Sequence, residues 1–122
     1  MTATFEYGDR IITLKFSLAA WEKMEQDVCT LGEFFDIFDS RSAVLLNYDT
    51  AEKVMRIACI LAWAAGGQPP VTQDELRAVL TPADVLELRN IIIKLVGESL
   101  TSENRTKSGP RDLVLEELEG KN

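Results

Sequence analysis

The nine residues from Ile57 to Ala65 contain no charged side chain, and this apolar run constrains the fold more than any other segment. The run is the second half of a predicted helix that begins at Asp49 or Thr50, and Gly66-Gly67 ends this helix. A helix without a polar face is surrounded by protein, whereas a membrane span needs roughly 20 apolar residues. We therefore expect a helix at the centre of a soluble fold, with no membrane contact.

Composition narrows the possible functions. The chain has 122 residues, which is the length of one domain, and 46% of them are hydrophobic. There is no histidine, which excludes serine-histidine and cysteine-histidine catalysis and histidine-metal sites. A net charge of −7 argues against binding to the phosphates of a nucleic acid.

The β signal lies at the N-terminus, over residues 2–16. Two segments rich in β-branched and aromatic residues flank Gly8-Asp9, which suits a tight hairpin turn. In the second segment Ile12, Leu14 and Phe16 share one face, as in a half-buried strand. A lone hairpin is marginal in water, so this one must pack on helices or pair with another edge.

The rest of the chain predicts helices that begin at capping side chains. The caps are Ser17, Thr30 with Glu33, Asp49 or Thr50, Thr72 with Glu75, and Thr81 ahead of Pro82. The helices are expected at about 18–28, 31–39, 50–65, 73–80 and 82–100, with one more helical turn over 43–46. The expected fold is mainly α with an N-terminal β-hairpin (α+β), a small helical bundle around the central apolar helix.

These elements form one domain over residues 1–102. The polar stretch that follows contains glycine and proline, so residues 103–122 are expected to be a flexible tail. Apolar residues among acids within it suit a short amphipathic helix over 112–119.

Two helices carry apolar residues whose role the sequence leaves open. Phe34, Phe35 and Phe38 crowd one short helix, where they form either a core plug or a contact surface. On the late helix a second apolar side, with Leu86, Ile93 and Leu100, lies beside the expected core side. Either several helices of the bundle wrap it, or it touches another molecule.

Side chains with catalytic chemistry are sparse. The acidic pair Asp36 and Asp39, and the pair Asp74 and Glu75, lack converging partners and are typical of solvated helix faces. A metal-dependent enzyme built on Asp36 and Asp39 is the weakest of the alternatives. Cys29 and Cys59 have no metal-site spacing and suit buried hydrophobic positions. We expect no enzymatic activity, no metal and no cofactor.

The order of the N-terminal motifs resembles a known family. A β pair leads into Ile12-Thr13-Leu14-Lys15-Phe16-Ser17-Leu18, then Trp21-Glu22-Lys23-Met24-Glu25, then Thr30-Leu31-Gly32-Glu33-Phe34-Phe35. With the alanine-rich apolar helix near Ile57 to Ala65, this order resembles the small tail assembly chaperones of long-tailed bacteriophages and prophages. The resemblance covers roughly residues 5–100 and rests on a pattern of apolar positions.

The resemblance implies a non-enzymatic protein that binds and solubilises the tape measure protein during tail assembly, with the tail tube protein as a second partner. It places the protein in the host bacterial cytoplasm and outside the mature virion. Shielding apolar helices requires an apolar face. The candidate contact residues for partner binding or self-association are Phe34, Phe35, Ile37, Phe38, Leu86, Ile93 and Leu100. Ile37 lies off the phenylalanine stripe and is expected to be exposed, and the hairpin edge over 2–7 or the late helix could join copies of the chain.

An alternative is a small acidic phage- or prophage-encoded adaptor or inhibitor of a host protein. The stretch from Glu22 to Asp39 has a net charge of −5, which could attract a basic partner. Binding of that kind weakens with salt, whereas burial of apolar surface does not.

Overall fold

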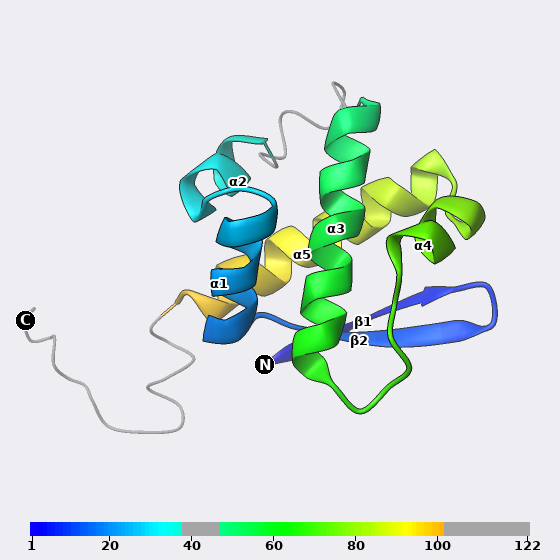
Figure 1. Ribbon diagram of the computed structural model, residues 1–122, viewed down its shortest axis with the longest axis horizontal. Coiled ribbons are helices and arrows are strands. Elements are labelled where there is room, and N and C mark those ends of the chain that lie inside the picture. Colours follow the sequence, from blue (N-terminus) through cyan, green and yellow to red (C-terminus); the bar gives the residue numbers. More distant parts are fainter. Residues whose placement is uncertain (38–46, 102–122) are drawn as a thin grey trace, which may run out of the picture.

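The computed structural model describes residues 1–37 and 47–101. For Ile37 it describes the backbone and not the side chain. Their fold is α+β, an N-terminal antiparallel hairpin followed by five helices (Figure 1). The elements are β1 (Thr2–Tyr7), β2 (Arg10–Lys15), α1 (Leu18–Asp27), α2 (Leu31–Ile37), α3 (Tyr48–Ala65), α4 (Gln73–Val79) and α5 (Pro82–Ser99). The turn predicted over 43–46 and the tail over 103–122 lie outside the described residues.

The hairpin confirms the two predicted strands and the buried side of Ile12 and Leu14, whereas Phe16 lies beyond the end of β2 and is half-buried. Gly8 has φ 56°, which a two-residue turn of this kind requires. Phe5 pairs with Ile12 across the strands, and Ala3 pairs with Leu14. Phe5, Ile12 and Leu14 are buried, while the opposite face is turned outward. The period-2 alternation of the sequence therefore predicted the correct face.

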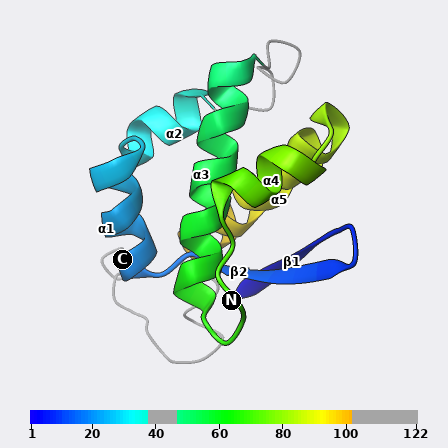
Figure 2. The same ribbon diagram turned by 45° about the vertical axis from the view of Figure 1, so that its right-hand side comes forward.

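Helix α3 is the centre of the fold. It crosses the hairpin and contacts β2, α1, α4 and α5, and the two views in Figures 1 and 2 show α1 and α4 on opposite sides of it. Its buried side chains are Val54, Met55, Ile57, Ala58, Ile60, Leu61 and Ala62. The predicted core side of α5 is also confirmed, with Val85, Leu88, Ile92, Leu95 and Val96 all buried.

Most caps lie where the sequence predicts them. The Thr30–Glu33 and Thr81–Asp84 capping boxes are both formed, and the Ser17 hydroxyl accepts a hydrogen bond from the N–H of Ala20. The start of α3 was predicted wrongly. Its cap is Asn47, whose side chain accepts from the Thr50 N–H at 2.9 Å, so the helix begins before Asp49.

Candidate functional site

Helix α3 is not covered by protein on every side. Trp63 is 57% exposed, Cys59 is half-buried and Arg56 is exposed, although Ile57 and Leu61 between them are fully buried. Positions 56, 59 and 63 are three or four residues apart and therefore lie on one strip of the helix. The expectation that the apolar run is surrounded by protein is thus wrong for this strip, where the Trp63 side chain is more than half exposed.

Two adjoining cavities make the apolar part of this strip, Cys59 and Trp63, the floor of a groove, and the charged Arg56 lies at its rim. Their volumes are about 390 Å³ and 480 Å³, and both are lined by Cys59, Ile60 and Val71. One wall is α1, and the other is the connector between α3 and α4. We call this feature the α3 groove; its further lining residues are Lys23, Asp27, Val28, Arg56, Ala62, Trp63, Gly66, Gln68, Pro69, Pro70 and Gln73.

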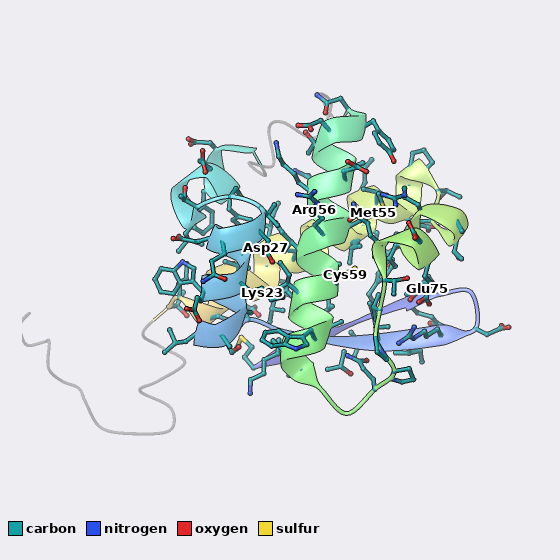
Figure 3. All side chains as sticks on the ribbon, in the orientation of Figure 1. Lys23, Asp27, Met55, Arg56, Cys59 and Glu75 are labelled. Atoms are coloured by element: carbon teal, nitrogen blue, oxygen red, sulfur yellow. The ribbon has the colours of Figure 1, made fainter. Side chains whose placement is uncertain are left out.

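The α1 wall presents charged side chains above the apolar floor. Figure 3 shows Lys23 and Asp27 beside Arg56 and Cys59 of α3. The Lys23 ammonium lies 5.5 Å from the centre of the Trp63 ring and 3.6 Å from the Asp27 carboxylate. Arg56 donates to the backbone carbonyl of Asp27 at 3.2 Å, which ties the end of α1 to α3. A partner in the groove therefore meets an apolar floor and a charged rim.

The connector wall is held by Gln68. Its side-chain amide donates to the carbonyl oxygens of Thr13 (2.8 Å) and Ala62 (3.0 Å) and accepts from the N–H of Thr13 (3.0 Å). One side chain therefore joins the connector to β2 and to the end of α3. Because every polar atom of this half-buried amide has a partner, the wall is fixed in place.

A second anchor lies farther along the same wall. Both Glu75 oxygens lie 2.9 Å from Nη1 of Arg10, and Oε2 accepts from the Tyr7 hydroxyl at 2.7 Å. Arg10 also donates to the carbonyl oxygens of Pro69 and Pro70. The hairpin is thereby fastened to the connector and to α4.

Burial and hydrogen bonding shift the pKa values of Tyr7 and Glu75 at this anchor and of Cys59 on the groove floor. Burial, reinforced by the hydrogen bond to Glu75, raises the pKa of Tyr7 to about 12. The hydrogen bonds from Tyr7 and then from Arg10 lower the pKa of Glu75 below its ordinary value. On the groove floor, burial raises the pKa of Cys59 to about 11, so this residue is a neutral thiol at physiological pH.

The contact residues predicted from the sequence differ in how far their side chains are exposed. Phe34 is completely buried and belongs to the core. The ring of Phe35 contacts the Phe34 ring edge to face, with 5.2 Å between the ring centres. Phe35 and Leu100 are 41% and 42% exposed and so are accessible. Leu86 and Ile93 are half-buried. The side chain of Ile37 and all of Phe38 lie outside the described residues.

The groove was not among the features predicted from the sequence, although the charged residues of α3 carry a signal for it. Asp49, Glu52, Lys53 and Arg56 mark one outward strip on the first half of α3. Continuing that strip at helical spacing leads to Cys59 and Trp63. The polar half therefore indicated which part of the apolar half would face outward.

Comparison with known proteins gives no relative: no family model, curated protein or solved structure matches this chain. Within residues 1–37 and 47–101, no group of three Cys, Asp or Glu side chains is placed to hold a metal ion. None of the helices in the part described combines the length and the apolar character needed to cross a membrane.

Proposed function

We propose that this protein is a non-enzymatic tail assembly chaperone, and that its α3 groove binds an apolar helix of the tape measure protein. The observation that carries the proposal is the exposed apolar floor around Trp63, flanked by two fixed walls. In the host cytoplasm this groove shields the tape measure protein until the tail tube assembles around it.

The chemistry of the groove suits an amphipathic helix. Such a helix inserts apolar residues at positions i, i+3, i+4 and i+7, which match a long groove with an apolar floor. Trp63 supplies a large rigid surface of the type that dominates binding energy at protein interfaces. Lys23, Asp27 and Arg56 lie at the rim, where opposite charges on the partner would set its direction.

A retention experiment with two matched variants tests the proposal. Trp63→Asp places a charge on the groove floor, whereas Leu18→Asp changes a side chain that is 79% exposed and does not line the groove. We expect the tagged wild-type chain and Leu18→Asp to retain co-expressed tape measure protein through a high-salt wash. We expect Trp63→Asp to lose it while keeping its helical circular dichroism.

Other outcomes would point elsewhere. Equal retention by Trp63→Asp would remove the groove as the binding site. Failure of the folded wild-type chain to retain the tape measure protein would sink the proposed function. Recovery of a host protein that leaves the wild-type chain as salt is raised would favour the acidic adaptor instead.

A further inference from the structure

The two outer edges of the hairpin differ. In β2 the N–H and the carbonyl of Thr13 both bond to the side chain of Gln68, so they point away from β1. Residues opposite each other in an antiparallel pair point the same way relative to the ladder. Thr4, which is paired with Thr13, therefore directs its own N–H and carbonyl away from β2, along the outer edge of β1.

In the part of the chain that the structure describes, the outer edge of β1 is not paired with another strand. By the same alternation Thr2 and Glu6 also direct their backbone groups outward, and all three side chains are exposed. Among residues 1–37 and 47–101, none outside the hairpin forms a hydrogen bond with Thr2, Thr4 or Glu6. An edge with unpaired donors and acceptors is a template for another strand.

We propose that the β1 edge pairs with the β1 edge of a second copy of this chain. The two strands run antiparallel about a two-fold axis at Thr4, so that Thr4 faces Thr4 and Thr2 faces Glu6 of the second copy. The result is a continuous four-stranded sheet in the order β2, β1, β1, β2. This dimer is independent of what occupies the α3 groove.

The residues of β1 suit this register. The strand carries one charge, on Glu6, and the register sets it opposite the neutral Thr2, so no like charges meet. The facing threonines at the axis are a favourable cross-strand pair. Each of the three edge residues directs one backbone N–H and one carbonyl toward the second copy. In this register every one of these groups forms a hydrogen bond with the second copy.

The state of the β2 edge explains why β1 pairs with the β1 strand of the second copy. Gln68 fills the central position of the β2 edge, so a second copy finds an accessible strand edge at β1. A patch that binds its own copy closes into a two-fold dimer.

A cavity of about 230 Å³ lies beside the β1 edge. It is lined by Thr2, Ala3 and Thr4 and by the α5 residues Ile91, Lys94, Leu95 and Glu98. The added strand would cover it, because antiparallel pairing keeps Ala3 and Phe5 of the second copy on the face where α5 lies.

Sedimentation equilibrium of the full chain, with variants at the axis, tests the dimer. Thr4→Pro removes an outward N–H that the hairpin itself does not use, and proline is tolerated at such edge positions. Thr4→Val keeps the N–H and is the matched control. We expect wild type and Thr4→Val to dimerise, and Thr4→Pro to bind at least about 100-fold more weakly with unchanged circular dichroism.

Two charge variants test the register. Within one chain position 2 faces Lys15 of β2, so Thr2→Glu favours the folded monomer and Thr2→Lys disfavours it. In the dimer position 2 faces Glu6 of the second copy, so we expect Thr2→Lys to tighten dimerisation about three- to tenfold and Thr2→Glu to weaken it equally. A wild-type chain that is monomeric at every concentration overturns the proposal. So does undiminished dimerisation of Thr4→Pro, or the reverse order of the two charge variants.

Discussion

The C-terminal half of α3 has two apolar faces that behave differently. The inward face, with Ile57, Ala58 and Leu61, is completely buried beneath the hairpin and the neighbouring helices. The outward face, with Cys59 and Trp63, forms the floor of the α3 groove and stays partly exposed. One unbroken apolar run therefore supplies both a core and a surface. Apolar surface left partly open between the two walls contributes less to folding than the buried face and is available for binding.

The largest expected change in the free energy of unfolding distinguishes the buried face of α3 from the exposed one. Leu61→Ala removes a fully buried side chain, and we expect it to lower the free energy of unfolding by about 2–5 kcal/mol. Trp63→Ala removes a larger side chain that is mostly in water, and its cost should be about 1 kcal/mol or less. Urea unfolding followed by circular dichroism measures both. Equal losses would mean that both faces belong to the core.

The next effect concerns the connector wall. Glu75→Ala leaves the partly buried Tyr7 hydroxyl without its acceptor and Arg10 without its carboxylate, and we expect a loss of about 1–3 kcal/mol in the free energy of unfolding. The control is Asp74→Asn on the same helix. The side chain of Asp74 is 89% exposed and pairs with Arg77, so its loss should stay within about 0.5 kcal/mol. Similar losses for the two variants would contradict the anchoring role of Glu75.

The same anchor predicts a dependence on pH. The pKa of Tyr7 rises from 10.0 to about 12 in the folded chain, so above pH 10 the unfolded chain loses this proton first. The stabilisation is complete below pH 10 and disappears as the pH approaches 12. Tyr7→Phe should lack this component, and the difference between the two unfolding profiles isolates it. On the acid side the lowered pKa of Glu75 gives a contribution that is present above its ordinary pKa and lost on acidification.

The smallest effect lies at the groove rim. Lys23→Ala removes the ammonium above the exposed Trp63 ring, and we expect a change of about 0.5–1 kcal/mol in the free energy of unfolding. A double-mutant cycle with Trp63→Ala separates this contact from the pairing of Lys23 with Asp27. A coupling energy of zero would show that the ring and the ammonium do not interact.

What the sequence predicted correctly is local in origin. The hairpin turn at Gly8 and the capping boxes at Thr30 and Thr81 depend on residues a few positions apart. Glu75 could be read only as a helix-start residue, because its partners Tyr7 and Arg10 lie 68 and 65 positions away. The polar strip on the first half of α3 indicated that Trp63 would face outward, whereas the walls of the groove beside it are placed by contacts between residues far apart in the sequence.

Phe34 and Phe35 show the same limit within one helix. Both belong to a stripe that suits either a core or a contact surface, and neighbours of equal hydrophobicity cannot be separated by composition. Packing buries one ring completely and leaves the other 41% exposed. Phe34 therefore belongs to the core, whereas Phe35 is accessible and its role in contacts stays a prediction.

The bonding of Gln68 also bears on the chemical ageing of the protein. Toward Thr13 its side chain takes the place of a peptide group, because it donates one N–H to the Thr13 carbonyl and accepts one hydrogen bond from the Thr13 N–H. Deamidation to glutamate would leave only acceptors facing the carbonyl oxygens of Thr13 and Ala62, which would repel them. The usual route to deamidation begins with attack by the backbone nitrogen of the next residue. That residue is Pro69, which has no N–H, so the amide that completes the β2 edge is placed where this reaction is blocked.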